Sequence, residues 1–503
     1  MYICMENRDL YRYEVHSLIK AFYPREEVKV LVEGDPHGEK ILRENPDIAM
    51  RLAFAPEGIT LTLAREDRTF FKQAAPGTDD AVKGPACKED VKHLLYDSLR
   101  EVTGQDLPWG DLIGIRPTKI ATAALQEGLS DEETVQRMME EHRCSKEKAE
   151  LSVGIAKRER EILDSLHHGD DGYSLYIGIP FCPTTCLYCS FPSFNLDLWK
   201  DRTGEYLDCL EREMEAGAKI MAGKHLDTVY IGGGTPTSLS AKELDRLLGG
   251  IERHFDLSEL TEFTVEAGRP DSITKDKLEA LAAHQVTRIS VNPQTMNEKT
   301  LRVIGRAHTV QQTVDAFQLA RSLGFSNINM DIILGLPGEG EEEVRHTLEE
   351  VRKLHPDSLT VHSLAIKRAS RLRRIIDEKG YPVLLNTKEM MDLAADAAAE
   401  MGMVPYYLYR QKNMSGNFEN TGFAVPGKYG IYNIAIIEEC QSILALGAGS
   451  ISKRALPGEG GRGLRLERCD NAKEVDVYMA NLDEMIRRKQ ALWGAAPDAP
   501  LTE

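Results

Sequence analysis

The sequence predicts an α/β protein whose central part is a parallel β-sheet covered by helices. From about residue 172, short runs rich in β-branched residues alternate with longer stretches of helical periodicity. Repeated strand–helix units of this kind are typical of parallel sheets. About six units are found, so the pattern predicts either a barrel short of the eight-fold form or an open doubly wound sheet. The expected strands are 174–179, 227–231, 262–267, 287–291, 327–334 and 357–362.

Helices are expected between these strands because apolar residues recur there at helical spacing. The clearest helical segments are 203–221, 241–255, 274–284 and 341–354. Ligands of parallel sheets bind at the carboxyl ends of the strands. The unusual segments of this sequence all follow expected strands, so we expect the functional residues to gather at that edge of the sheet.

Outside this region the pattern changes. Apolar alternations at 28–34 and 59–67 have the period of strands, and 87–104 has that of a helix, which predicts a separate α+β unit. A charged helical stretch, 145–166, then leads to "HHGDDG". After about residue 370 the alternation ends, and a region rich in Gly, Asn and Tyr predicts a smaller lobe packed on the sheet. The expected parts are an N-terminal α+β domain at 1–165, a core at 166–400, and a small C-terminal lobe with its tail at 401–503.

Composition and charge exclude several classes of function. The formal charge of −18 argues against wrapping nucleic acid or lying on an anionic membrane, since both need clustered Lys and Arg. We find no apolar run of eighteen or more residues, so no membrane span is expected. The nine cysteines are odd in number and mostly scattered, which favours a reducing cytoplasm over a disulfide framework.

Three cysteines lie together in "FCPTTCLYCSF", on the loop after the first strand of the core: Cys182, Cys186 and Cys189. A structural zinc site needs a fourth Cys or His nearby, and the next cysteine, Cys209, falls inside an expected helix. A cubane iron–sulfur cluster fits better, because each thiolate holds one iron and the fourth iron stays open for a small molecule. The alternative, three packed thiols without a metal, is an oxidation hazard.

Cys-x3-Cys-x2-Cys with an aromatic residue, Tyr188, before the last cysteine resembles the radical S-adenosylmethionine (SAM) superfamily. From about 174 to about 455 the motifs further resemble the oxygen-independent coproporphyrinogen III oxidase (dehydrogenase) family. The "LYRQKN" segment and the long N-terminal extension resemble its HemZ-like branch. The resemblance implies a partial (β/α)6 TIM-like barrel that binds a 4Fe–4S cluster through three cysteines, together with SAM.

Further motifs resemble the SAM contacts of this family. In "YIGGGTPTSL", consecutive glycines allow a close backbone approach to a ligand, and the resemblance implies that Gly233, Gly234 and Thr235 hold the amino-acid end of the methionine. Glu266, in "TVEAGRPD", corresponds to a contact to polar groups of the cofactor, although a helix-capping carboxylate is the alternative. Gln294, in "RISVNPQTMN", lies at the position of the family's glutamine.

Three more residues carry the resemblance beyond the glycine segment. Arg306, in "LRVIGRAHT", matches a ligand-binding arginine, and Asp331, in "INMDIILGLPGE", matches an aspartate that bonds ribose hydroxyls. Tyr176 falls where the family places a tyrosine over the cofactor. Tyr176 and Arg306 are also the expected catalytic residues, and Tyr188 is a further expected cofactor contact. Ala365 and Ile451 correspond to contacts made by backbone or packing.

The resemblance implies the anaerobic conversion of coproporphyrinogen III to protoporphyrinogen IX. In that chemistry the reduced cluster cleaves SAM, and the 5′-deoxyadenosyl radical takes a hydrogen from a propionate, which then loses carbon dioxide and one electron to become a vinyl group. An electron donor such as flavodoxin or ferredoxin is implied as a partner. The four carboxylates of the substrate need cationic contacts. The candidates for these contacts are Arg306, Lys367, Arg368, Arg410 and Lys412.

Two departures from the best-known bacterial enzyme of the family keep alternatives open. Phe191 stands where that enzyme has a fourth cysteine, and Gly178 stands where it has a histidine. Members without the fourth cysteine include haem-trafficking chaperones. One alternative is therefore a haem-binding or haem-delivering protein, with His308 and His362 as candidate haem ligands. The other is a radical enzyme acting on another tetrapyrrole, such as a haem-degrading methyltransferase.

Overall fold

The structure is a computed structural model that describes residues 1–6, 11–36, 38, 40–41, 48–55, 57–73, 85–114, 116–189, 191, 193–365, 371–372, 378, 386–411, 417–458 and 463–494. The chain forms two compact units. The first comprises Met1–Ala156 and Tyr409–Glu419, and the second comprises Lys157–Leu408 and Asn420–Glu503. The observed division thus differs from the predicted boundaries at 165/166 and 400/401.

The first unit is an α+β unit built on a five-stranded sheet. Its strands are β1 (Tyr2–Glu6), β2 (Lys29–Val32), β3 (Ile48–Ala55), β4 (Gly58–Leu63) and β5 (Arg68–Gln73). They lie in the order β2-β1-β3-β4-β5, parallel on both sides of β1 and antiparallel from β3 to β5. Ile59, Leu61 and Leu63 alternate with two threonines along β4, so one face of this strand is apolar and buried.

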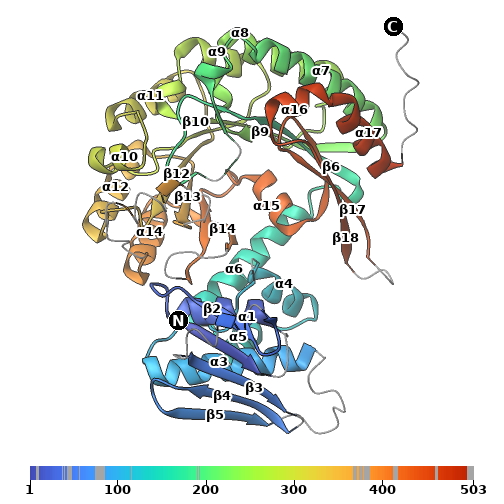
Figure 1. The fold of residues 1–503 in the computed structure, drawn as a ribbon. Coiled ribbons are helices and arrows are strands. Elements are labelled where there is room, and N and C mark those ends of the chain that lie inside the picture. Colours follow the sequence, from blue (N-terminus) through green and yellow to red (C-terminus); the bar gives the residue numbers. More distant parts are fainter. Residues whose placement is uncertain are drawn as a thin grey trace. The chain divides into compact units, whose positions relative to one another are not determined.

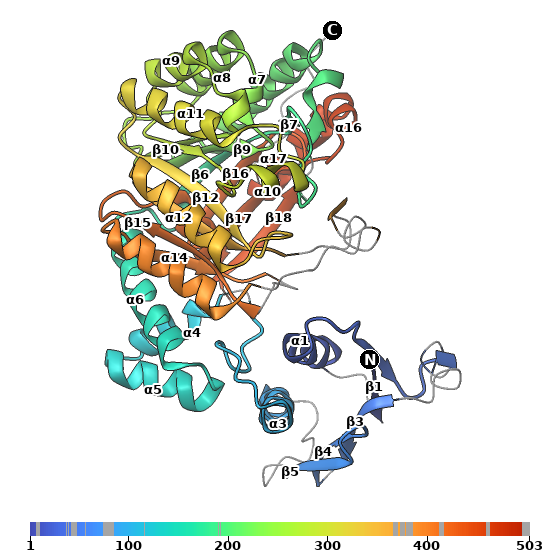
Figure 2. The same ribbon diagram turned by 90° about the vertical axis from the view of Figure 1, so that its left-hand side faces the viewer.

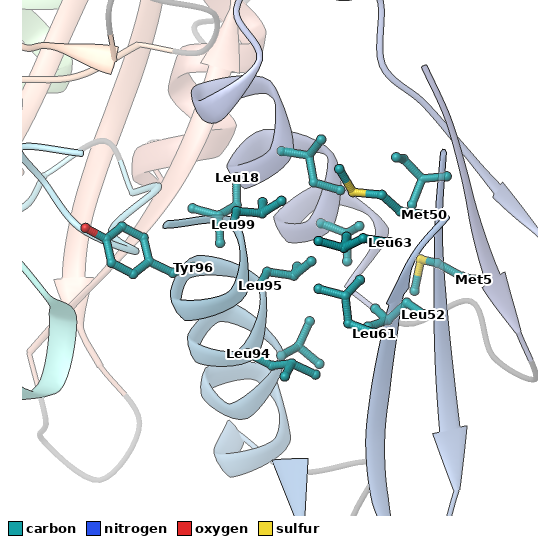
Figure 3. Packing of buried hydrophobic residues seen from close by; sticks show 14 of the residues in the cluster. Met5, Leu18, Met50, Leu52, Leu61, Leu63, Leu94, Leu95, Tyr96 and Leu99 are labelled. Atoms are coloured by element: carbon teal, nitrogen blue, oxygen red, sulfur yellow. The ribbon is translucent and has the colours of Figure 1, made fainter. Parts of the chain in front are cut away.

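Helices cover that apolar face. The helices of this part of the chain are α1 (Arg12–Phe22), α3 (Pro85–Thr103), α4 (Thr118–Gln126), α5 (Asp131–His142) and α6 (Lys146–Leu163), the last of which crosses the division between the units. Figure 3 shows Leu95 and Leu99 of α3 and Leu18 of α1 directed toward Leu63 and Met50 of the sheet. This packing forms the core of the first unit.

Tyr409–Glu419 is counted with the first unit, and buried polar contacts hold Arg410 and Glu419 there. Glu419 accepts hydrogen bonds from Trp109 Nε1 at 2.7 Å and from Lys148 Nζ at 2.5 Å. The guanidinium of Arg410 donates to the backbone oxygen of Leu112 and to Asn417. The bonds to Trp109, Lys148 and Leu112 join positions 271 to 310 apart in the sequence, so no local pattern predicts them.

The second unit contains an eleven-stranded sheet, ordered β14-β15-β13-β12-β11-β10-β9-β6-β16-β17-β18. Its middle is a run of parallel strands. They are β6 (Gly169–Ile179), β9 (His225–Gly233), β10 (Glu262–Gly268), β11 (Arg288–Val291), β12 (Ile328–Leu334) and β13 (Ser358–Ser363). All six expected strands are therefore confirmed, in the order in which they occur along the chain.

Helices follow these strands and lie along the outside of the curved sheet (Figure 1). They are α7 (Thr203–Ile220), α8 (Ala241–His254), α9 (Lys275–Ala283), α10 (Glu298–Val303), α11 (Val310–Ser322), α12 (Glu341–Leu354) and α14 (Lys388–Glu400). Local sequence fixes the start of some of them. Ser240 and Glu243 form a capping box at the start of α8, and Thr309 and Gln312 form one at the start of α11. The arrangement matches a partial (β/α)6 barrel, which settles the choice that the sequence left between a barrel and an open sheet.

The C-terminal residues extend the sheet at both edges, whereas the sequence predicts a lobe packed upon it. β14 (Val404–Tyr409) and β15 (Asn420–Ala424) follow β13, which pairs antiparallel with β15. At the other edge β16 (Gln441–Leu446) pairs parallel with β6, and β17 (Ile451–Pro457) and β18 (Leu464–Asp470) continue antiparallel, as Figure 2 shows. The last helices are α16 (Val475–Ala480) and α17 (Leu482–Trp493).

One helix lies on the concave side of the sheet. α15 (Ile431–Glu438) begins where the buried carboxylate of Glu262, on β10, accepts from the backbone nitrogens of Ile431 at 2.6 Å and Tyr432 at 3.2 Å (Figure 1). A carboxylate at a helix N-terminus satisfies unpaired N–H groups and suits the helix dipole. The ring of Tyr432 consequently lies 4.4 Å from that of Tyr230 on β9 and stacks on it.

Candidate functional site

The three cysteines lie on the loop that leaves the carboxyl end of β6. Cys182 ends the short strand β7 (Phe181–Cys182), which pairs with β8 (Phe194–Asn195), so both ends of the loop are tied together. All three side chains are partly buried free thiols. Burial raises the pKa of the Cys182 thiol to about 11 and also raises that of Cys189. Metal binding at these thiols therefore involves loss of protons.

The middle of the loop is anchored by Leu187 and Tyr188. Leu187 N donates to Ile304 O at 3.0 Å, and both residues pack against a buried apolar cluster that includes Ile333 and Leu364. Burial also raises the pKa of the Tyr188 hydroxyl. Because these two residues separate Cys186 from Cys189, the anchor fixes where the second and third thiols lie.

The glycine segment after β9 runs directly beside the start of the cysteine loop. Gly234 N donates to Ile179 O at 2.8 Å, and Thr235 N donates to Phe181 O at 2.8 Å. A Cβ on Gly234 would lie 2.6 Å from Phe181 O, closer than Cβ atoms come, so glycine is required there. Thr235 Oγ1 lies 3.4 Å from Cys182 Sγ. The predicted neighbourhood of Gly233, Gly234, Thr235 and the cysteines is therefore present.

Stacked tyrosines line the concave side below these loops. The ring of Tyr176, on β6, is 6.2 Å from that of Tyr230 and 6.3 Å from that of Tyr432, and both pairs are stacked. Gly233 has a φ of 104°, a conformation that favours glycine, and a Cβ there would lie 3.2 Å from Tyr176 Oη. Tyr176 thus lies directly beneath the glycine segment.

Two carboxylates occupy neighbouring positions on the same side of the sheet. Glu266, at the end of β10, accepts a hydrogen bond from Tyr230 Oη, and burial raises the pKa of its carboxyl to about 7. Asp331, on β12, accepts from Asn329 Nδ2 at 2.7 Å and lies 3.9 Å from His362 Nε2. Although burial raises the pKa of Asp331, these partners outweigh it and lower the pKa. The helical turn that follows β10, Pro270–Ser272, has Arg269 at its N-cap position, so Glu266 does not cap it.

Gln294 and Arg306 fix the loop after β11. Gln294 has a φ of 66°, and its backbone bonds both Asp331 O and Ile333 N at 2.9 Å. Arg306 is 8% exposed and donates to Asn292 O at 2.9 Å and to Tyr188 Oη at 3.3 Å. Within the described part of the chain, Arg306 Nε and Asn292 Oδ1 are buried without a hydrogen-bond partner. Buried polar atoms of this kind are where a polar ligand is expected to bind.

The other residues predicted to contact cofactor or substrate do not all lie in the barrel. Ala365 is partly buried just after β13, whereas Ile451, at the start of β17, is 44% exposed. Arg410 belongs to the first unit, where burial lowers its pKa to about 10. Lys367, Arg368 and Lys412 lie outside the described residues.

The structure also describes the two candidate haem-ligand histidines and the two positions that differ from the best-known enzyme of the family. His308 is 2% exposed, and burial lowers its pKa to about 3, while His362 is partly buried beside Asp331. Phe191 is 67% exposed. Gly178 lies deep in β6, where its carbonyl accepts from Tyr206 Oη at 2.7 Å.

Sequence reasoning missed Arg269, Tyr230 and Tyr432. Arg269 lies three residues after Glu266, and its Nη1 is 3.8 Å from Cys186 Sγ. Its place after a strand end was a usable signal. Tyr230 is two residues before the glycines and shares a face with Tyr176 through the strand register. No local pattern could have joined Tyr432 to them, because α15 reaches the barrel through tertiary packing.

The donor set fits a cluster better than one metal ion. A structural zinc site fills all four positions of its metal with protein ligands. The cysteine loop carries three free thiols, Cys182, Cys186 and Cys189. An iron–sulfur cluster suits three thiolates, because each binds a different iron and the fourth iron stays open.

Comparison with known proteins agrees with this geometry. Residues 176–351 match the family model described as the radical SAM superfamily. The solved structure of coproporphyrinogen III oxidase (HemN) from Escherichia coli, described as a radical SAM enzyme, superposes with a TM-score of 0.51 at 25% identity, covering 66% of this chain and 73% of that one. Fold and site together define a radical SAM protein. The superfamily implies a 4Fe–4S cluster and SAM.

Two related proteins show to which family within the radical SAM superfamily the chain belongs. The oxygen-independent coproporphyrinogen-III oxidase-like protein HemZ of Bacillus subtilis is 44% identical over 418 residues, which are 81% of this chain and 82% of that protein. The haem chaperone HemW of Bacillus subtilis is 37% identical over 195 residues, 39% of this chain and 51% of that protein. The chain belongs to the family of oxygen-independent coproporphyrinogen III oxidase-like proteins, in its HemZ-like branch. No described helix has the length and apolarity to cross a membrane.

Proposed function

We propose that the protein carries out the oxygen-independent oxidative decarboxylation of coproporphyrinogen III to protoporphyrinogen IX. The observation that carries this proposal is the 44% identity to HemZ, which spans most of both chains and so includes residues beyond the radical SAM region. In each turnover one propionate loses a hydrogen, carbon dioxide and one further electron, and becomes a vinyl group. The electron passes to an acceptor, and two propionates react.

Cys182, Cys186 and Cys189 are the proposed cluster ligands. Their support is the shared loop, whose ends are tied by the pairing of β7 with β8, and the anchor at Leu187 and Tyr188. When bound, the cluster and SAM supply the reductive carbon–sulfur cleavage from which radical chemistry starts, and the protein positions and shields them. A small electron carrier such as flavodoxin or ferredoxin is the proposed reductant.

The residues around the cysteines are proposed to hold SAM. The close approach of Gly233, Gly234 and Thr235 to the cysteine loop leaves backbone groups of this segment next to Cys182, where the amino-acid end of the ligand would bind. The carboxylates of Glu266 and Asp331 are proposed to accept from its amine or hydroxyl groups. Glu266 lies near the end of β10 and Asp331 lies within β12, and both retain lone pairs beyond the contacts described above.

The other predicted contacts are proposed to shape the same pocket. Tyr176 offers the flat face of a stacked ring, and Gln294 and Arg306 rigidify the opposite loop. Tyr188 orients Arg306 through its hydroxyl. Tyr176 and Arg306 remain the proposed catalytic residues, Arg306 through the Nε that has no partner among the described residues. For Ala365 and Ile451 we propose contacts to the cofactor through the backbone. The side chain of Ile451 is half exposed.

The substrate carboxylates require cations that the described barrel only partly supplies. Arg306 is the candidate within the barrel, and its Nε faces no described partner. Arg410 is committed to Leu112 and Asn417 in the first unit, which weakens its proposed substrate role. Lys367, Arg368 and Lys412 stay proposed contacts from outside the described residues.

Haem delivery is the second candidate function. It is favoured by the 37% identity to a haem chaperone and by Phe191, which replaces a cysteine of the best-known oxidase. The structure gives it less support from His308, whose ring is almost fully buried beside Arg306. His362 is the more accessible of the two histidines.

One anaerobic experiment distinguishes the candidates. Reconstituted protein is incubated with reductant, SAM and coproporphyrinogen III, and carbon dioxide, vinyl products and deoxyadenosine are measured. The oxidase proposal expects two carbon dioxide molecules per porphyrinogen in sequential steps, and none from Cys186→Ala. Stoichiometric haem binding without any vinyl product would instead establish haem delivery. Deoxyadenosine formed only when haem is supplied would indicate a different tetrapyrrole substrate.

A further inference from the structure

We propose that Arg269 is a positioning residue for the cluster: its guanidinium fixes the loop before Cys186 and donates an N–H to the Cys186 sulfur, which raises the reduction potential of the bound cluster. This inference rests on the proposed role of Cys186 as a ligand. It concerns a residue outside the cysteine motif and outside the SAM contacts.

Arg269 is held rigidly at the carboxyl end of β10. Its side chain is 3% exposed. Nε donates to one carboxylate oxygen of Asp271 at 3.0 Å, and Nη2 donates to the other at 2.7 Å. Two parallel bonds of this kind fix the plane of the guanidinium. The direction of the remaining nitrogen, Nη1, is therefore set by Asp271 before any cofactor binds.

Nη1 is directed at the cysteine loop. It lies 2.9 Å from Thr184 O, 2.8 Å from Thr184 Oγ1 and 3.8 Å from Cys186 Sγ. Thr184 is two residues before Cys186, so one side chain binds both the backbone of the loop and the sulfur. A lysine could supply a charge here but not the fork that bonds Asp271 and the loop together.

The placement predicts an effect on electron uptake. Reduction adds a negative charge to an iron–sulfur cluster, and N–H···S hydrogen bonds stabilise the more negative state, which raises the potential. Asp271 offsets the charge of Arg269 at longer range. Removal of Arg269 therefore leaves a negative charge near the cluster, while removal of the charge of Asp271 leaves a positive one. The two changes should move the potential in opposite directions.

The test is a redox titration of the reconstituted protein, followed by visible absorbance and electron paramagnetic resonance, without SAM or substrate. In Arg269→Gln the equilibrium constant for reduction should fall about tenfold, a potential lower by about 59 mV for one electron. In Asp271→Asn the potential should rise, and Arg269→Lys should recover part of the loss. Arg253→Gln is the control, because Arg253 is an exposed arginine that pairs with Glu211 on the helical face.

The outcomes separate this inference from the proposed function. If wild-type protein assembles no cluster, the ligand assignment fails, and this inference fails with it. If the wild type assembles the cluster and both variants retain it at an unchanged potential, the inference alone is overturned. If Arg269→Gln stays folded but loses the cluster, Asp271→Asn decides: a raised potential supports the inference, and an unchanged one overturns it.

Discussion

The ammonium of Lys489 and the carboxylate of Glu213 form an ion pair of 2.7 Å, with side chains only 1% and 0% exposed. Glu213 lies on α7 and Lys489 on α17. The same carboxylate accepts from Tyr478 Oη at 2.6 Å, Asn471 Nδ2 at 2.8 Å and Gly447 N at 2.8 Å. Helix α17 is thus bonded to α7, the first α-helix after the cysteine loop.

This network also reaches the strand that leads into the cysteine loop. A Cβ on Gly447 would lie 2.5 Å from Gly178 O, so the turn after β16 is packed against β6. Tyr206 joins the two by donating to Gly178 O at 2.7 Å while accepting from Ala448 N at 3.0 Å. The turn after β16 therefore packs against β6, the strand from which the cysteine loop starts, and helps to hold it in place.

Replacing Lys489 with methionine should destabilise the second unit by about 3–5 kcal/mol, because Glu213 is left as an uncompensated buried charge. Thermal or urea unfolding measures this. Arg487→Met is the matched control: its pair with Glu484 is exposed, and it should change stability by less than about 1 kcal/mol. The combination Lys489→Met with Glu213→Gln should recover part of the loss, because the amide removes the buried charge and keeps an acceptor oxygen for the buried donors Tyr478, Asn471 and Gly447. Equal effects of the two single variants would contradict the buried network.

Gly234→Ala should abolish SAM binding, because the added Cβ would lie 2.6 Å from Phe181 O and must push the glycine segment away from the cysteine loop. Calorimetric titration of the reconstituted protein with SAM measures the effect. Gly204→Ala is the control, since nothing lies within 4 Å of a Cβ at that position on α7. That variant should bind SAM normally. Normal binding by Gly234→Ala would show that the close approach is not needed.

Glu266 should make stability depend on pH in the ligand-free protein. Its pKa rises from 4.5 to about 7 on folding, so the folded state holds the proton more tightly. Below pH 4.5 the carboxyl is protonated in both the folded and the unfolded state, and the protein has its full stability. As the pH rises toward and through 7, the unfolded state releases the proton more readily than the folded state, so the free energy of unfolding falls. The full shift corresponds to about 3 kcal/mol. Unfolding between pH 5 and 8 should show this loss in the wild type and not in Glu266→Gln. Parallel curves for the two proteins would mean that Glu266 keeps an ordinary pKa.

Much of the barrel could be predicted because its signals are local. Each parallel strand is a short apolar run, each is followed by a helix of clear periodicity, and helix α12 has the bounds 341–354 that the pattern predicts. The placement of Gly234 and Gln294, each after its strand and at the same edge of the sheet as the cysteine loop, follows from one rule, that parallel strands share a carboxyl edge.

What the sequence could not predict depends on contacts between distant segments. Residues 441–446 form β16 beside β6, which no local pattern indicates, because strand order is set by packing. Glu419 binds Trp109 and so assigns residues 409–419 to the first unit. The position of Arg269 after a strand was a usable signal, but its contact with Cys186 depends on the fold.

The central claim is that three thiolates hold a cluster, and iron and sulfide analysis after anaerobic reconstitution tests it most directly. The wild type should hold about four irons and four sulfides per chain with broad visible absorbance, and Cys182→Ala, Cys186→Ala and Cys189→Ala should each lose most of them. Cys209→Ala, on α7, should retain them. Zinc alone in the wild type, or a full cluster in the Cys186→Ala variant, would contradict the claim.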